Sequence, residues 1–182
     1  MFNKFNVQKF LDKKPPSDNS FTTMQEIKQL GKIPMNVKFV KDKDDINASF
    51  QKIIKDKNLD VPKNTVNNLI KESAPIIMKI KKHYNRPRPK VLAKKMNINL
   101  DDKELDSMKT PSYPSGHSAQ GVLVAEVLSQ MHPKHAKAFK KLGEDISYSR
   151  NVARAHYPSD SKFGKELGKD LFNHIKADKN ES

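Results

Sequence analysis

The residues of this 182-residue chain whose types and spacing best fit a chemical role fall into three short groups. The groups are Lys81 with Arg88-Pro89, then Pro114-Ser115-Gly116-His117, then Ser149-Arg150 with His156 and Asp160. Together they hold two histidines, one carboxylate and three cations. That set of side chains can bind an oxyanion and move a proton or a phosphoryl group at it.

Arginine usage points to the same residues. Lysine and arginine together number 35, yet arginine occurs only four times, at Arg86, Arg88, Arg150 and Arg154. A guanidinium is a flat, permanently charged fork that can bind two oxyanion oxygens at once, which an ammonium cannot do. The sequence therefore predicts an oxyanion site built from residues near 86–88 and 150–154.

The second group stands at the start of the clearest helical pattern in the chain. The free N–H groups of a first helical turn, together with the helix dipole, attract anions. Gly116 lets the backbone approach a ligand closely, and the Ser115 hydroxyl adds a donor. His117 would reach a bound oxyanion from the same turn.

In the third group, Asp160 follows His156 by four residues, so its carboxylate can accept a hydrogen bond from the imidazole Nδ1–H. That bond fixes the tautomer and leaves Nε2 as a nucleophile or base. With Arg150 and the first group, three cations would surround one anion, which suits the charge that develops in phosphoryl transfer. Lys79 and Arg86-Pro87 share the spacing of Lys81 and Arg88-Pro89, so spacing alone leaves the register open.

The three groups, in this order, resemble the signature of the type 2 phosphatidic acid phosphatase superfamily: K-x6-R-P, P-S-G-H and S-R-x5-H-x3-D. That superfamily holds bacterial class A non-specific acid phosphatases, integral-membrane lipid phosphatases and vanadium haloperoxidases. The similarity covers about residues 75–175. The stretch PSYPSGHSAQG and the distance from His117 to Ser149 are most similar to the class A enzymes, whose pattern selects Lys81 and Arg88.

The resemblance implies that His156 attacks phosphorus to form a phosphohistidine, that Asp160 orients it, and that His117 protonates the leaving oxygen. It assigns phosphate binding to Lys81, Arg88, Ser115, Gly116 and Arg150. It implies no cofactor and no metal, with vanadate binding as a phosphate mimic. Arg86 and Arg154 lie outside the signature, so each either supports the site, contacts the substrate phosphate or forms a structural ion pair.

Helices must position these residues, because no strand pattern is visible. The sequence predicts an all-α, compact, single-domain bundle over residues 1–182, of the acid phosphatase and vanadium haloperoxidase type, with 1–20 irregular. The predicted helices cover 22–30, 45–57, 62–72, 73–85, 91–95, 115–131, 134–149 and 159–175, and Ser73 caps the fourth with Pro75 in its first turn. Gly164 and Gly168, four residues apart, favour close helix packing.

The composition limits the functions to be considered. No apolar run reaches the ~18–20 residues of a membrane span, so we expect no membrane insertion. The N-terminus lacks the apolar core of a signal peptide, and we expect a cytoplasmic location. A net charge of +14 favours anionic partners, of which a small phosphorylated substrate fits best. The sequence does not define the oligomeric state.

The predicted function is metal-independent hydrolysis of a soluble phosphate monoester through a phosphohistidine. Two alternatives stay open. A vanadate-dependent haloperoxidase would use the same scaffold and the same oxyanion site. A nucleic-acid-binding protein would use the +14 charge, but the lysines are dispersed from Lys4 to Lys179 and stacking aromatics are few.

Overall fold

The computed structural model describes residues 1–181, and all regular structure in that range is helical, as the sequence predicts. The helices are α1 (Gln8–Leu11), α2 (Phe21–Gly31), α3 (Val37–Asp44), α4 (Ile46–Asp56), α5 (Thr65–Tyr84), α6 (Pro89–Lys95), η1 (Asp106–Lys109), α7 (Gly116–Met131), η2 (Pro133–His135), α8 (Ala136–Val152) and α9 (Pro158–Glu181). η1 and η2 are single turns of 3₁₀-helix.

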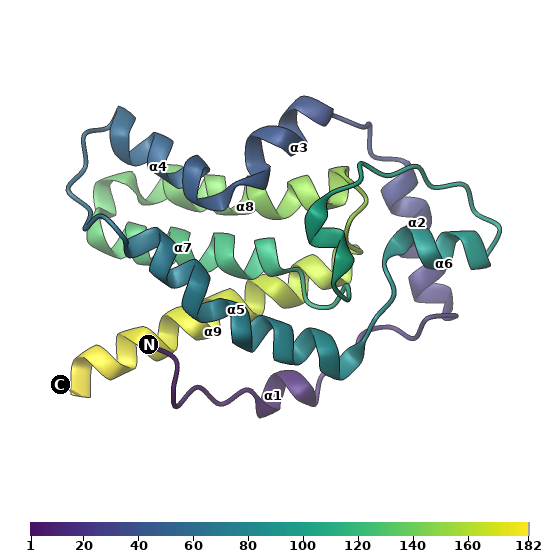
Figure 1. The fold of residues 1–182 in the computed structure, drawn as a ribbon, viewed down its shortest axis with the longest axis horizontal. Coiled ribbons are helices and arrows are strands. Elements are labelled where there is room, and N and C mark those ends of the chain that lie inside the picture. Colours follow the sequence, from purple (N-terminus) through teal and green to yellow (C-terminus); the bar gives the residue numbers. More distant parts are fainter. Residues whose placement is uncertain (182) are drawn as a thin grey trace.

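Helix α7 lies at the centre of the bundle and packs against α8, α9 and α5 (Figure 1). Its buried side chains include Leu123, Val124 and Leu128, none of which is exposed to solvent. A helix that is apolar on nearly all sides is stable only inside a bundle. Helices α3 and α4 lie along α8, and α2 and α6 lie at one end of the bundle (Figure 1).

Two glycines let α9 approach α7 closely, as their spacing predicts. A Cβ atom on Gly168 would lie 2.4 Å from the Ala119 carbonyl oxygen, and one on Gly164 would lie 2.5 Å from the Ser115 carbonyl oxygen. No side chain fits at either distance. The close approach brings the first turn of α9 beside the first turn of α7, where two of the predicted chemical groups lie.

The prediction of two helices that meet at Ser73 is wrong, because α5 runs unbroken from Thr65 to Tyr84 with Pro75 inside it. Proline costs a helix interior about 3 kcal/mol, since it removes one backbone hydrogen bond and crowds the preceding turn. A buried stripe on both sides of the proline, which includes Leu69 and Ile77, offsets that cost by packing into the core.

Three further differences concern the ends of the chain and one missed helix. Residues 1–20 are not wholly irregular, because α1 forms one helical turn there. The sequence analysis missed α3, which buries only Val40 and is signalled chiefly by the Asn36 side chain capping its first turn. Helix α9 continues to Glu181, beyond the predicted end near residue 175.

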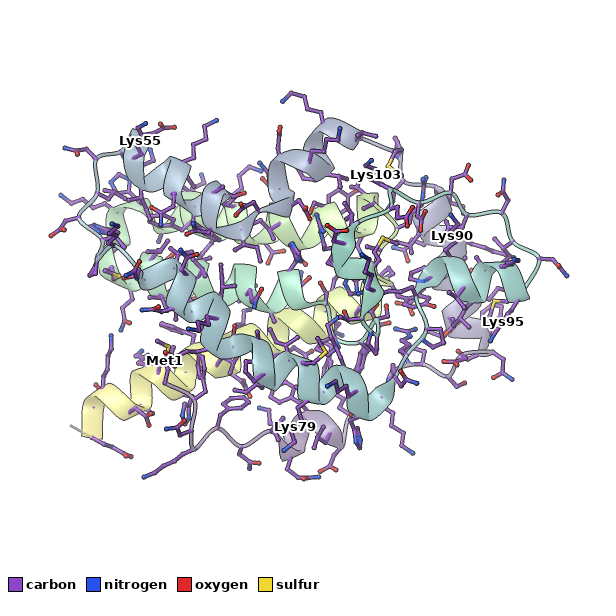
Figure 2. All side chains as sticks on the ribbon, viewed as in Figure 1. Met1, Lys55, Lys79, Lys90, Lys95 and Lys103 are labelled. Atoms are coloured by element: carbon purple, nitrogen blue, oxygen red, sulfur yellow. The ribbon has the colours of Figure 1, made fainter. Side chains whose placement is uncertain are left out.

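The basic side chains are spread over the surface. Figure 2 shows Lys55, Lys79, Lys95 and Lys103 projecting from different edges of the bundle. Some lysines are paired with neighbouring carboxylates, as Lys165 is with Glu144 at 3.1 Å. None of the helices within residues 1–181 combines the length and the apolar composition that a bilayer-spanning segment needs.

The helix contact at Gly168 makes a testable prediction about stability. We expect Gly168→Ala to lower the free energy of unfolding by about 1–3 kcal/mol, because the added methyl group meets backbone that cannot move aside. The measurement is the midpoint of thermal or urea unfolding. Gly31→Ala is the matched control, since its Cβ would meet only Leu100 at an ordinary 3.8 Å. Equal stability of the two variants would contradict this account of the α7–α9 contact.

Candidate active site

The three predicted groups converge, although they come from six parts of the fold. Lys81 lies in the last turn of α5, and Arg88 immediately precedes α6. Ser115 caps α7, with Gly116 and His117 in its first turn. The remaining members are Arg150 near the end of α8, His156 in the connection to α9, and Asp160 in the first turn of α9.

The centre of the site is a buried histidine–carboxylate pair. His156 is 2% exposed, and its Nδ1 lies 3.0 Å from Oδ2 of the fully buried Asp160. The same carboxylate oxygen accepts the Tyr157 N–H at 3.0 Å and a short hydrogen bond from the Ser112 hydroxyl. A carboxylate that already accepts these donors fixes the imidazole with its proton on Nδ1. The lone pair of Nε2 then faces Arg88, whose Nη1 is 3.0 Å away.

Burial and positive charge together keep His156 neutral. Its pKa lies well below the ordinary value because burial disfavours the imidazolium, and Arg88, Lys81, Arg150 and His117 repel it further. Of the three predicted cations, Arg88 contacts the ring directly, and Lys81 and Arg150 act on it electrostatically. A neutral imidazole retains the lone pair that a nucleophile needs.

The cations of the first group also fix the loop that precedes α7. The Lys81 ammonium donates to the Pro111 carbonyl at 2.7 Å, and Arg88 Nε donates to the Thr110 carbonyl at 2.8 Å. Burial and the neighbouring Arg88 charge lower the pKa of Lys81 to about 7. Lys81 also lies next to the α7 N-terminus, since a Cβ on Gly116 would be 3.9 Å from its Cε.

The first turn of α7 is tied to the histidine–carboxylate pair. The Ser115 N–H donates to the Asp160 carbonyl oxygen at 3.0 Å, and the Ser115 hydroxyl oxygen accepts the Ser118 N–H at 3.2 Å. Helix geometry leaves the N–H groups of Gly116 and His117 without a partner inside the helix. These donors and the positive end of the α7 dipole therefore face the same region as Lys81.

Arg150 and His117 share a partner that the sequence analysis missed. Arg150 is fully buried, and its Nη1 donates to Oδ1 of Asp44 at 3.0 Å, while its buried Nη2 has no partner within residues 1–181. His117 Nε2 lies 2.8 Å from the Asp44 carbonyl oxygen. In the sequence, Asp44 sits among alternating lysines and aspartates, so it has the pattern of a solvated charge and gives no signal of this role.

Arg86 lies behind Asp160 and supports it. Its Nη1 donates to Asp160 Oδ1 at 2.8 Å, and its guanidinium carbon lies 3.7 Å from the centre of the Tyr157 ring. Glu26 completes this support, with Oε2 3.4 Å from Arg86 Nη2 and Oε1 accepting the Ser159 N–H at 2.6 Å. The ion-pair role left open for Arg86 is therefore the one that its contacts favour. Glu26 gave no signal in the sequence.

The contacts of Arg154 belong to the fold. Its side chain donates to the carbonyl oxygens of Leu30 at 3.3 Å, Ile33 at 2.9 Å and Asp101 at 2.9 Å. Its backbone adopts a left-handed conformation with φ 58°. These hydrogen bonds join the connection between α8 and α9 to the end of α2 and to the loop that contains Asp101. The partners of Arg154 are therefore not among the predicted site residues.

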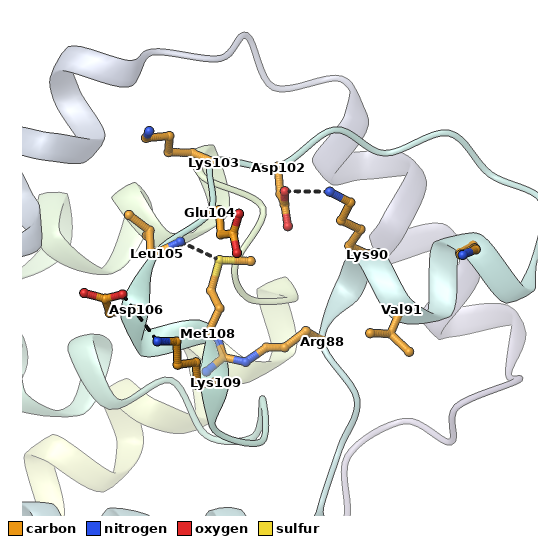
Figure 3. A pocket seen from close by; sticks show the side chains of 11 residues that line it. Arg88, Lys90, Val91, Asp102, Lys103, Glu104, Leu105, Asp106, Met108 and Lys109 are labelled. Carbon is orange, nitrogen blue, oxygen red and sulfur yellow. Dashed lines mark hydrogen bonds and ion pairs between the residues drawn. The ribbon is translucent and has the colours of Figure 1, made fainter.

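An open pocket of about 780 Å³ borders Arg88 on its other side (Figure 3). Its walls carry opposite charges in pairs, with Lys90 3.1 Å from Asp102 and Lys109 3.8 Å from Asp106. Of the predicted site residues, Arg88 alone lines it. The pocket therefore places open space and further charged side chains, Lys94, Lys103 and Glu104, beside Arg88.

Comparisons with known proteins find bacterial acid phosphatases that are similar to this chain. The chain is 40% identical over 88 residues to a non-specific acid phosphatase of Salmonella typhimurium, covering 48% of this chain and 35% of that protein. It is 33% identical over 94 residues to a non-specific acid phosphatase of Providencia stuartii, covering 51% and 38%. An acid phosphatase of Zymomonas mobilis is 32% identical over 112 residues, covering 59% and 42%.

These matches span roughly two fifths or less of the length of the curated relatives. The family model described as the PAP2 superfamily matches residues 67–168, which is more than half of the chain and includes every residue of the three groups from Lys81 to Asp160. The superfamily indicated by the motifs is therefore confirmed, and this chain belongs to the PAP2 superfamily.

Proposed function

We propose that the protein hydrolyses phosphate monoesters of soluble compounds through a phosphohistidine formed on His156. The observation that carries this proposal is the buried, neutral imidazole whose Nδ1 is held by Asp160 and whose Nε2 faces the cations. An imidazole fixed in this way has its lone pair directed at the place where a bound phosphorus atom would lie.

In the first step, the Nε2 lone pair of His156 forms a bond to phosphorus as the bond to the leaving oxygen breaks. Lys81, Arg88 and Arg150 neutralise the negative charge that spreads over the equatorial oxygens. His117 donates its Nε2 proton to the leaving oxygen. The Asp160 carboxylate stabilises the positive charge that the phosphorylated imidazole carries.

In the second step, water attacks the phosphorus atom, and His117 accepts a proton from it. The phosphorus–nitrogen bond breaks, its electron pair returns to Nε2 of His156, and phosphate leaves. The side-chain cations of the chain supply the positive charge that both steps need, so the proposal requires no metal ion. Vanadate, a phosphate mimic, should bind the same groups.

Loss of His156 should abolish turnover. We expect His156→Ala to lower kcat for p-nitrophenyl phosphate at least about a thousandfold, because no other side chain replaces an aligned nucleophile. The assay is run with EDTA present, where the wild-type protein should stay fully active. His135→Ala is the matched control, since His135 lies beside the opposite end of α8 from Arg150.

Two outcomes would contradict the proposal. Loss of wild-type activity in EDTA would overturn the metal-free steps. Bromide oxidation with vanadate and peroxide, in the absence of phosphatase activity, would instead favour the haloperoxidase chemistry of the same scaffold.

The guanidinium shape of Arg88 and Arg150 should matter as well as their charge. We expect Arg88→Lys and Arg150→Lys each to lower kcat/KM about tenfold to a hundredfold, because an ammonium cannot bind two phosphate oxygens in a fork. Arg154→Lys should retain turnover while lowering the unfolding temperature, because Arg154 holds carbonyl oxygens of the fold. Near-wild-type kcat/KM in both Arg88→Lys and Arg150→Lys would contradict the proposal that these two arginines bind phosphate while Arg154 only stabilises the fold.

The pH dependence should be bell-shaped with an acidic maximum. His117 must hold a proton to act as the acid, and burial and Arg150 lower its pKa to about 4, so the fraction of His117 that can act as the acid falls as pH rises above that value. Asp160 must be ionised to hold His156, and burial raises its pKa to about 6, so the fraction of Asp160 that is ionised falls as pH drops below that value. We therefore expect the maximum between pH 4 and pH 6. A flat profile across this range and up to about pH 9 would contradict the paired roles.

A further inference from the structure

Asp44 contacts two groups of the candidate active site at once. Its carboxylate accepts from Arg150 at 3.0 Å, and its carbonyl oxygen lies 2.8 Å from His117 Nε2. The proposed function assigns Arg150 to the phosphate and His117 to the leaving oxygen. Asp44, which precedes the matched residues 67–168, therefore already contacts Arg150 and His117, two groups that the proposed function assigns to the substrate.

The position of Asp44 is fixed by the two helices that it joins. Asp44 ends α3, and the next residue, Asp45, begins α4 by accepting the Ala48 N–H at 2.9 Å. Both helices pack on α8, with Val40 and Phe50 fully buried. The Asp44 side chain itself is 48% exposed, so the carboxylate lies at the rim of the site between the buried Arg150 and solvent.

The carboxylate presents to Arg150 the same kind of atom that a phosphate would present. A carboxylate oxygen and a phosphate oxygen are both anionic acceptors for a guanidinium. A phosphate bound at Arg150 must share the fork with Asp44 or displace it. In either case the negative charge of Asp44 opposes the negative charge of the phosphate.

The same charge also faces the place of the leaving group. Asp44 Oδ1 lies 3.6 Å from Nε2 of His117, the atom that would protonate the leaving oxygen. A leaving group that carries further negative charge would meet this carboxylate, whereas a neutral or cationic leaving group would not be repelled. The three cations Lys81, Arg88 and Arg150 contact the transferred phosphoryl group, so they do not cancel the repulsion between Asp44 and an anionic leaving group.

We propose that Asp44 is a specificity-determining residue, which weakens the binding of free phosphate and selects phosphate monoesters whose leaving group carries no additional negative charge. This inference rests on the proposed function, because it assigns the leaving-group side of that site. It also accounts for product release, since the Asp44 carboxylate can return to Arg150 when phosphate leaves.

The test removes the charge of Asp44 and keeps its shape. Asp44→Asn is compared with Asp42→Asn, which makes the same change in net charge two residues away, at a carboxylate paired with Lys38. Orthophosphate binding is measured by calorimetry. kcat/KM is measured for pyrophosphate, whose leaving group is anionic, and for p-nitrophenyl phosphate as the reference ester.

We expect Asp44→Asn to bind orthophosphate about five- to tenfold more tightly than the wild-type protein, as removal of one nearby like charge implies. The ratio of kcat/KM for pyrophosphate to that for p-nitrophenyl phosphate should rise by a similar factor. Asp42→Asn should change neither quantity. A lower unfolding temperature with an unchanged ratio and unchanged orthophosphate affinity would show that Asp44 merely balances the charge of Arg150, and would overturn the proposal.

The failure of this inference and the failure of the proposed function give different results. A wild-type protein that binds orthophosphate but hydrolyses neither compound would overturn the proposed hydrolysis. A wild-type protein that hydrolyses the monoester, with an Asp44→Asn variant of unchanged selectivity and affinity, would overturn only the role of Asp44.

Discussion

The buried carboxylate of Asp160 accepts hydrogen bonds from Ser112, Arg86, His156 and the Tyr157 N–H, and its backbone carbonyl accepts the Ser115 N–H. These donors come from the loops around α6 and α7, from the connection before α9 and from the α7 cap. An unpaired buried carboxylate would be strongly unfavourable, so all of these segments must be in place for the fold to be stable. The same requirement aligns the imidazole of His156.

The site concentrates positive charge in a buried place, at a cost to stability. Burial and the Arg88 charge lower the pKa of Lys81, and burial together with the Arg88, Lys81 and Arg150 charges lowers that of His156. Within residues 1–181 the carboxylates that contact these cations and Arg86 are those of Asp160, Asp44 and Glu26. A dianionic ligand would relieve the remaining repulsion.

Helices α2 and α3, which precede the matched residues 67–168, carry carboxylates that contact the charged groups of the site. Glu26 on α2 holds Ser159 and lies beside Arg86, so it supports Asp160 from behind. Asp44 at the end of α3 contacts Arg150 and His117 from the front. The α2–α4 region therefore does more than cover the core, because it supplies carboxylates on both sides of the cation cluster.

Features that depend on residues close together in the chain could be predicted from the amino-acid sequence. Helical periodicity predicted α7 and α8, because their apolar residues recur with the helical period. The four-residue spacing predicted the contact of His156 with Asp160, since the short connection before α9 keeps the two residues close together. Pro75 misled the prediction, because its local cost is offset by packing that only the folded core provides. The roles of Glu26, Arg86, Arg154 and Asp44 were decided by tertiary structure alone. Their partners lie far away in the sequence, and a lone charged residue carries no local sign of whether a distant charge will be buried beside it.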